Sequence, residues 1–496
     1  MAESLLELLQ ESCAVTLPMH MPGHKRNTLL APYLKTLSAD IDITEILGFD
    51  HLHAASGVLK DAMDNAASVF GANHTFFLVN GSTVGLLAAI RALTSPGDSV
   101  LMARNCHRSV YHALALNNLK PYFIYPMTNL RFQVMASLSV RKIESAIAQH
   151  RDARVLIITS PTYEGVTSDL PAIISLAHRH GLTVLVDEAH GSHLGFHPFF
   201  PKSALSAGAD IVIHSLHKTM PSLTQTALAH VRTPALANEM QRQLSVFETT
   251  SPSFLLLASI DACVRLIRDR GDELFSAWQA ALDAFDRKTL GLKHLRVMGY
   301  GKHRGKPMDN VFGLEPSKLY VSTTNSNING YELAQIMRTQ HATEPEMITP
   351  QGVLAMTGMG DTVATLERFG DILLAIDRRL SPAKSVKVPL MAPQVQSAVP
   401  LSKAERAPFF CLDIADSVGW TLAENITVYP PGIPVVVPGE VMNEQAVRYL
   451  LAAREAGNTI LRSRSDLDGQ VAVLRDTEPK NPAAAVDAVP EGVNVL

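Results

Sequence analysis

Lys218 lies in a short polar stretch between two apolar runs of the sequence. The first run, Ile-Val-Ile, covers residues 211–213, and the second extends from Ala227 to Val231. Continuous β-branched runs of this length are typical of buried strands. A charged, unpaired lysine between two buried strands is costly, and a neutral amine can form a Schiff base with a carbonyl group. The alternative is a loop lysine that reaches solvent, so the rest of the sequence must decide.

A second candidate site lies at Gly81, Ser82 and Thr83. These residues fall between an expected strand, 76–79, and an expected helix, 84–93. The free N–H groups of a helix start, the helix dipole and two hydroxyls together make a phosphate cradle. The commoner use of Ser and Thr there is as an N-cap that serves only the helix.

An aspartate and a histidine complete the pattern. Asp187 follows the expected strand 183–186, where it could cap the next turn or keep a pyridine nitrogen protonated so that the ring accepts electrons. His107 could stack on such a ring or bond to nearby backbone. The lysine follows the aspartate by 31 residues (218 − 187 = 31). The order of cradle, stacking residue, aspartate and lysine resembles the layout of fold-type I enzymes that use pyridoxal 5'-phosphate (PLP).

Short apolar strands and helices alternate from residue 61 to residue 187, which predicts an α/β fold with a mostly parallel sheet covered on both faces. Ligands of such sheets bind beyond the carboxyl ends of the strands, where the polar clusters fall. We expect four parts: an N-terminal helix and active-site loop segment (1–60), a PLP-binding large domain (61–298), a small α/β domain (299–384) and a C-terminal α+β domain with a loose tail (385–496).

The composition excludes several classes of protein. Of the 496 residues 47% are apolar and 18% are charged, and the net charge is −4, so no basic surface indicates nucleic-acid binding. No apolar stretch approaches the roughly 18 residues of a membrane span. The N-terminus carries acids where a signal peptide carries bases, and the four scattered cysteines are typical of reduced thiols, so we expect a cytoplasmic protein.

Nine stretches resemble one family when taken together. They are PMHMPGHKRN, DITE, NGST, RNCHRSV, SPTYEG, DEAHGSHLGF, SLHKT, TTSPSF and YPPGIPVVVPGE, and they occur between about residues 17 and 445. Together they closely resemble the Orn/Lys/Arg decarboxylases of bacteria, which have the fold-type I architecture. The resemblance implies PLP-dependent decarboxylation of a basic L-amino acid that feeds polyamine synthesis. Arginine is the first expected substrate, followed by lysine and ornithine.

The resemblance also implies a role for each matching residue. Lys218 would hold PLP as a Schiff base, and Asp187 would bind the pyridinium. His107 and Ala189 would lie against opposite faces of the ring. His217 would face the substrate carboxylate or donate a proton. The remaining expected cofactor-binding residues are Gly81, Ser82, Thr83, His190, Ser215 and, reaching the phosphate of a neighbouring subunit, Thr249. We therefore expect a homodimer or higher homo-oligomer with shared active sites.

The sequence departs from the large enteric members of the family in two places. It begins almost directly at the PGHKRN loop, where those members carry a receiver-like domain, which puts their ten-subunit assembly in doubt for this chain. His190 stands where the large members have an aromatic residue, and the shorter members carry DEAHG as here.

Four alternatives compete with this interpretation. Residues 187–190 spell the DEAH box of helicases, but the phosphate loop that box requires is missing. Zinc binding by histidines is disfavoured because no HExxH motif occurs. An aminotransferase or another lyase on the same fold stays open, because Arg338 and Arg368 are available for a substrate carboxylate. A non-catalytic PLP-binding protein is disfavoured because every catalytic position is filled.

Overall fold

The structure is a computed structural model of the whole chain. It describes residues 4–15, 19, 21–22, 25–26, 29, 35–383, 393–429, 432–455, 458–465 and 469–479. Most of the expected active-site loop at 17–27, including His20 and His24, lies outside these residues, as do Pro430 and Pro431 of the YPPG stretch.

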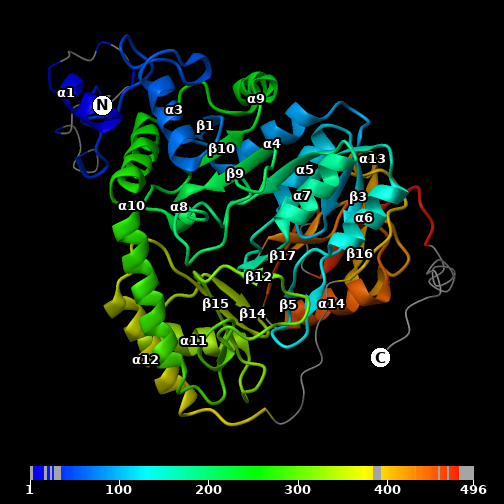
Figure 1. Cartoon of the computed structure of the whole chain (residues 1–496). Coiled ribbons are helices and arrows are strands. Elements are labelled where there is room, and N and C mark those ends of the chain that lie inside the picture. The colour runs from blue at the N-terminus through cyan, green and yellow to red at the C-terminus, as the bar shows by residue number, and fades with distance from the viewer. Residues whose placement is uncertain are drawn as a thin grey trace.

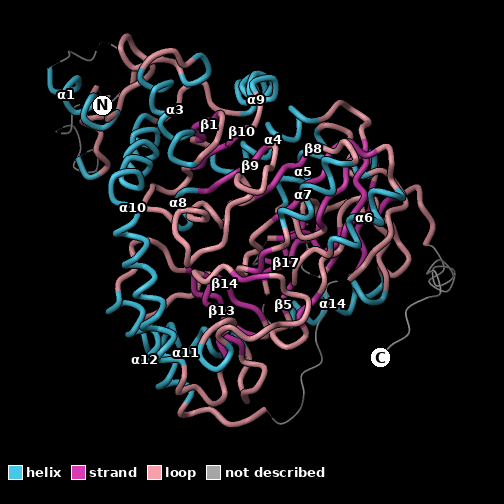
Figure 2. The backbone as a smooth tube through the Cα atoms, in the orientation of Figure 1, coloured by secondary structure: helices cyan, strands magenta, loops and turns pink. Residues whose placement is uncertain are grey.

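A seven-stranded sheet forms the centre of the molecule, in the order β1-β10-β9-β8-β6-β2-β3 (Figures 1 and 2). Strands β9, β8, β6, β2 and β3 pair in parallel, and β10 pairs antiparallel with both β9 and β1. The mostly parallel sheet expected from the sequence is confirmed. The bounds are β1 (His74–Leu78), β2 (Ser99–Ala103), β3 (Lys120–Ile124), β6 (Ala153–Thr159), β8 (Thr183–Asp187), β9 (Ile211–Ser215) and β10 (Ala227–Val231).

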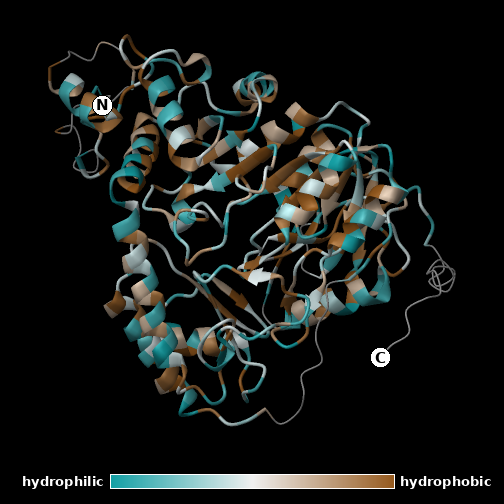
Figure 3. Cartoon of the chain, viewed as in Figure 1, coloured by the Kyte–Doolittle hydropathy of each residue, from teal (hydrophilic) through white to brown (hydrophobic). Residues whose placement is uncertain are grey.

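Helices follow the strands as the alternation of the sequence predicted. Side chains from the middle strands, such as Leu156, Leu185 and Val212, have no exposed surface, because helices cover the sheet. Figure 3 shows apolar colour along these strands and mixed colour on the helices. The helices of this part are α3 (Val58–Phe70), α4 (Gly81–Leu93), α5 (Arg108–Leu116), α6 (Val140–Gln149), α7 (Leu170–Arg179), α8 (Leu216–Thr219) and α9 (Pro234–Phe247).

A smaller antiparallel sheet, in the order β11-β13-β15-β14, forms a second unit. The 36-residue helix α10 (Phe254–Thr289) runs along one side of the molecule from the large sheet to this one (Figure 1). The buried Trp278 of α10 donates a hydrogen bond from Nε1 to Thr357 Oγ1 at 3.0 Å, which fixes the helix to the end of β15. The elements of this unit are β11 (Arg296–Val297), β13 (Lys318–Ser322), α11 (Gly330–His341), β14 (Met347–Thr349), β15 (Gly352–Met356) and α12 (Val363–Asp377).

The C-terminal part has its own apolar core between two small sheets and helix α14. One sheet pairs β16 with β20, and the other has the order β18-β17-β19. The bounds are α13 (Leu401–Ala404), β16 (Phe409–Asp413), β17 (Ile426–Tyr429), β18 (Ile433–Val436), α14 (Glu444–Glu455), β19 (Thr459–Arg462) and β20 (Gln470–Leu474).

The remaining elements are short connections. They are α1 (Leu5–Val15), the pair β4 (Thr128–Asn129) and β5 (Val134–Met135), the pair β7 (Val166–Thr167) and β12 (Gly313–Leu314), and the 3-10 turns η1 (Leu52–Ala54), η2 (Gly301–His303) and η3 (Ile414–Asp416). Among the helices of the described ranges, none combines the length and the apolar character that crossing a membrane requires.

Candidate active site

The carboxyl ends of β8 and β9 bring Asp187 and the lysine segment together. The two strands are neighbours, with Asp187 opposite Ile213, and β9 ends at Ser215. The sequence indicated a loop after Ser215, but the structure has one turn of helix, α8, which Met220 N closes by donating to Leu216 O at 2.9 Å. This turn directs Lys218 back over the end of the sheet toward the β8 loop.

The expected phosphate cradle lies at the same edge, because β1 runs in the same direction as β9. Ser82 Oγ and Ser215 Oγ form a hydrogen bond, which joins the start of α4 to the end of β9. Asn80, the N-cap residue of α4, makes no side-chain cap bond, so the first N–H groups of the helix keep their capacity for an anion. Gly81 has a φ of 72°, which favours glycine. Thr83 belongs to this turn, but its side chain is exposed.

The environment of Lys218 lowers the pKa of its amine toward neutral pH. Burial lowers the pKa of Lys218 to about 8, and the positive charge of Lys318 adds to the lowering. The negative charges of Asp187 and Glu346 act in the opposite direction and raise the pKa. Lys218 Nζ lies 2.8 Å from His190 Nε2. The pKa of His190 lies well below its usual range because of burial and the charge of Lys218. A neutral imidazole therefore faces the amine, which suits a nucleophilic lysine.

Asp187 is buried, with 4% of its surface exposed, and its Oδ1 accepts a hydrogen bond from Ala189 N at 3.2 Å. Burial raises the pKa of Asp187 against the charge of Lys218. A buried carboxylate is stabilised by a cationic partner, and a protonated pyridine nitrogen is such a partner. Ala189, which is expected to lie against one face of the ring, is thus hydrogen-bonded to Asp187.

Two histidines of the expected site are neutral, with tautomers set by their partners. His107 Nδ1 accepts from Ser109 N at 3.3 Å and lies 2.8 Å from Ser109 Oγ, so Nε2 carries the proton. Burial, together with the charge of Lys218, lowers the pKa of His107 to about 4. His217 Nδ1 lies 2.9 Å from Thr226 O. Because a carbonyl oxygen only accepts, Nδ1 carries the proton of His217 and Nε2 is left as a base.

Thr249, which is expected to reach the phosphate of a neighbouring subunit, lies close to the start of α4 in its own chain. Thr249 N donates to Asn80 Oδ1 at 3.1 Å. Thr249 O lies 2.9 Å from His53 Nε2. Asn80 and His53 fix this segment next to the cradle through contacts that one sequence alone cannot reveal.

Several residues on which the alternatives depend have other partners in the structure. His193 bonds to Glu315, His214 to Glu188 and His217 to a carbonyl group. Among the described residues, no group of three or more His, Cys, Asp or Glu is arranged to hold a metal ion. Arg338, which an aminotransferase would need for a substrate carboxylate, is paired with Glu344, Nε to Oε2 at 2.8 Å. Arg368 is exposed on α12.

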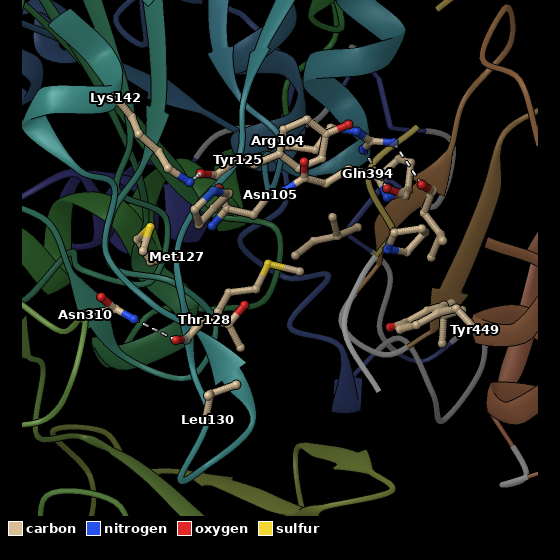
Figure 4. A pocket seen from close by; sticks show the side chains of 17 residues that line it. Arg104, Asn105, Tyr125, Met127, Thr128, Leu130, Lys142, Asn310, Gln394 and Tyr449 are labelled. Carbon is tan, nitrogen blue, oxygen red and sulfur yellow. Dashed lines mark hydrogen bonds between the residues drawn. The ribbon is translucent and has the colours of Figure 1, made fainter. Parts of the chain in front are cut away.

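A cavity of about 330 Å³ lies between the large sheet and the C-terminal part. Figure 4 shows its wall of Tyr125, Met127 and Leu130 on one side and Tyr449 on the other. Arg104 closes one end: it donates to Pro434 O at 2.7 Å and Val435 O at 2.9 Å, and its Nη2 lies 3.0 Å from Glu440 Oε2.

Arg104 is two residues before Cys106 and three before His107, so this buried cluster anchors the loop that carries the histidine expected to stack on the ring. Both Arg104 and Glu440 are buried, with 6% and 1% of their surface exposed. Burial raises the pKa of Glu440 against the charge of Arg104. The C-terminal part is therefore fixed to the active-site edge of the large sheet.

Comparisons with known proteins agree with this geometry. Residues 10–289 match the family described as "Orn/Lys/Arg decarboxylase, major domain", and residues 385–478 match its C-terminal domain. An arginine decarboxylase of Halalkalibacterium halodurans is 32% identical over 473 residues, which cover 92% of this chain and 94% of that protein. The chain belongs to the Orn/Lys/Arg decarboxylase family.

A second arginine decarboxylase and a solved lysine decarboxylase structure are also similar to this chain. An arginine decarboxylase of Bacillus subtilis is 30% identical over 449 residues, covering 88% of this chain and 90% of that one. A crystal structure of the Francisella novicida lysine decarboxylase has a TM-score of 0.80 at 18% identity, and the match covers 95% of this chain and 80% of that one. The expected fold, family and decarboxylase class are thus confirmed.

Three residues close to Lys218 and His190 were not expected from the sequence. Tyr163 has its ring 4.4 Å from that of His190, and its hydroxyl donates to Glu346 Oε1 at 2.6 Å. Lys318 Nζ donates to His190 O at 3.3 Å. Tyr163 lies in the SPTYEG stretch, which marked its position without a role. No motif in the sequence around Glu346 or Lys318 indicated a role in the site. Both belong to the small sheet region and reach the site only through the fold.

Proposed function

We propose that this decarboxylase removes the carboxylate of a basic L-amino acid, arginine first and then lysine or ornithine, with PLP as its cofactor. The observation that carries the proposal is the position of Lys218. The pKa of its amine is lowered to about 8. Lys218 follows β9, whose last residue Ser215 bonds to Ser82, and the neighbouring strand β8 ends in Asp187.

The residues at the sheet edge fit PLP. Lys218 would hold the aldehyde carbon, Asp187 the pyridine nitrogen, and His107 and Ala189 the two faces of the ring. The phosphate would lie at the start of α4, where Gly81, Ser82, Thr83 and Ser215 gather and the N-cap makes no side-chain bond. When bound, PLP supplies an electron sink for the pair that the departing carboxylate leaves behind.

His217 is suited to hold a proton near the reacting carbon. Its Nε2 is unprotonated, since Nδ1 donates to Thr226 O, and the ring is only partly buried. Burial lowers the pKa of His217, so it is a neutral base at pH 7 that can face the substrate or return a proton taken from solvent. His190, on the other side of Lys218, would lie beside the cofactor and hold the amine in place.

Glu346 is the carboxylate best placed for the distal cation of the substrate. It faces the site from the loop before β14, where its charge acts on Lys218. The hydroxyl of Tyr163 fixes Oε1, and the side chain is exposed, so a guanidinium can approach it. A guanidinium presents several donors in a planar fork that suits a carboxylate.

Two other described acids near this edge are committed elsewhere. Glu315 is paired with Lys318 and His193, and Glu188 accepts from His214 and Ser203. Burial raises the pKa of Glu164, which favours its neutral form. This elimination supports Glu346 as the acid that selects a basic substrate.

We choose arginine first because the two relatives named above are arginine decarboxylases and match most of this chain. The amine product would feed polyamine synthesis, and the free cysteines Cys13, Cys106, Cys263 and Cys411 support a reducing compartment such as the cytoplasm. We also propose a homodimer or larger homo-oligomer. The exposed Thr250 and Ser251 beside Thr249 are then available to a neighbouring subunit.

The test is to incubate the purified holoenzyme with arginine, lysine or ornithine and identify the amine and the carbon dioxide released. Borohydride reduction followed by peptide mapping locates the cofactor. We expect release of carbon dioxide with the amine of arginine, lysine or ornithine and a label on Lys218. A label on another lysine would overturn the assignment of the site.

A further inference from the structure

A ring of polar contacts surrounds Lys218 and includes two residues of the small sheet region. From the amine, the path runs from Lys218 Nζ to His190 Nε2 at 2.8 Å. The carbonyl oxygen of His190 accepts from Lys318 Nζ at 3.3 Å. Lys318 Nζ also lies 3.3 Å from Glu315 Oε2. The side chain of Lys318 thus reaches from the start of β13 to the loop after β8.

The path returns to Lys218 through its neighbour in the chain. Glu315 Oε1 lies 2.9 Å from His193 Nε2, and His193 Nδ1 lies 3.1 Å from Thr219 Oγ1. Because a carboxylate only accepts, Nε2 carries the proton of His193 and Nδ1 accepts from the hydroxyl of Thr219. Lys318 and Glu315 therefore hold Lys218 at both ends: at the amine through His190 and at the backbone through Thr219.

Stability does not explain why this pair is buried here. Lys318 and Glu315 have 2% and 1% of their surface exposed. Removal of two charges from water offsets most of their mutual attraction, so the ion pair itself adds little to the stability of the fold. The position of the charges relative to Lys218 is what an apolar pair would not reproduce.

The charge of Lys318 acts on the reacting groups. After burial itself, Lys218 and Lys318 are the charges that lower the pKa of His190, and Lys318 also lowers that of Lys218. Lys318 and His193 lower the pKa of Glu315 to about 2 in spite of its burial, so Glu315 stays ionised. The groups that face Lys218 are Asp187 from β8, His190 from the following loop, His107 before α5, His217 on α8, Lys318 on β13 and Glu346 before β14.

We propose that Lys318 is a positioning residue of the decarboxylase, which acts through His190 to fix the direction and the protonation state of Lys218. The inference rests on the proposed role of Lys218 as the PLP lysine. It gives the small sheet region a function in the site beyond the binding of substrate. A shift of that region relative to the large sheet would be transmitted to Lys218 through Lys318 and Glu315.

The test compares holoenzymes in which the pair is changed. Lys318→Met alone leaves Glu315 buried and unpaired, so the main variant is Lys318→Met with Glu315→Gln, which removes both charges. The exposed Lys293 supplies the matched control, Lys293→Met. For each protein we would record the melting temperature, the cofactor absorbance from pH 6 to pH 10, kcat and KM, and the borohydride label on Lys218.

We expect the double variant to fold and to carry the label. The pH of its absorbance transition should rise by about one unit, because the charge of Lys318 lowers the pKa of Lys218, whereas Glu315 is not among the charges that act on it. Its kcat should fall by roughly tenfold to a hundredfold with a smaller change in KM, as for a misdirected reacting group. Lys293→Met should match the wild type. Lys318→Arg, which keeps the charge, should keep the absorbance transition at the wild-type pH.

Wild-type values of both the transition and kcat in the double variant would show that the pair is only structural. If that variant does not fold, Lys318→Arg decides, and a shifted transition there would overturn the inference. Failure of the wild type itself to be labelled at Lys218 would instead refute the proposed function, so the two failures are distinguishable.

Discussion

Replacement of Glu346 by Gln tests the proposed contact with the distal cation of the substrate. Glutamine keeps an oxygen that can accept the bond from Tyr163, 2.6 Å away, and removes only the charge. A guanidinium about 4 Å from a carboxylate gains roughly 4 kcal/mol at an effective dielectric constant of about 20. Glu346 is exposed, so solvent screening reduces this to about 0.2–1 kcal/mol. The expected loss in kcat/KM is roughly 1.5-fold to fivefold.

The assay is the release of carbon dioxide from arginine by wild type, Glu346→Gln and the matched control Glu344→Gln. Glu344 is two residues away, but it is paired with Arg338. We expect the loss only in Glu346→Gln, mainly as a higher KM, because the contact is present both before and during the reaction. Equal kcat/KM in the wild type and Glu346→Gln, or an equal loss in Glu344→Gln, would refute the assignment of Glu346.

Three further predictions concern other parts of the site. Asp187→Asn should keep the fold and the cofactor but lower kcat by roughly 10²–10³, and steady-state kinetics with near-normal turnover would mean that Asp187 only caps its loop. In the apoprotein the pKa of Lys218 is lowered from 10.5 to about 8, so between these values the unfolded chain binds more protons and the free energy of unfolding should rise with pH. Lys218→Met should therefore raise the melting temperature at pH 7 but not at pH 11, which calorimetry at both pH values checks. If sites are shared between subunits, mixing Lys218→Ala with a variant altered at Thr249, Thr250 and Ser251 should restore activity toward about a quarter of wild type. No recovery after proven subunit exchange would place each site within one chain.

The strands and their terminal residues could be predicted because they depend on local sequence. The run 183–186 predicts a strand followed by Asp187, and the structure has β8 at Thr183–Asp187. The order of Ser82, Asp187 and Lys218 then indicated which strand ends must meet, since parallel strands bring their carboxyl ends to one edge.

The parts that could not be predicted depend on contacts between distant segments. Glu346 and Lys318 approach the site from a separate sheet, and nothing near them in the sequence distinguishes them from other charged residues. The position of Thr249 depends on Asn80, 169 residues earlier. The tautomers of His107 and His217 depend on single hydrogen-bond partners, which only the three-dimensional structure supplies.

The contact between Arg104 and Glu440 has a consequence for the order in which the chain becomes complete. The two residues are 336 positions apart. At about 5–20 residues per second, a ribosome needs roughly 17–67 s to reach Glu440 after Arg104 has been made. During that time the guanidinium that anchors the His107 loop has neither its carboxylate nor the carbonyl groups of residues 434 and 435. The large sheet can form before the C-terminal part exists, but the His107 loop acquires its final support only near the end of synthesis.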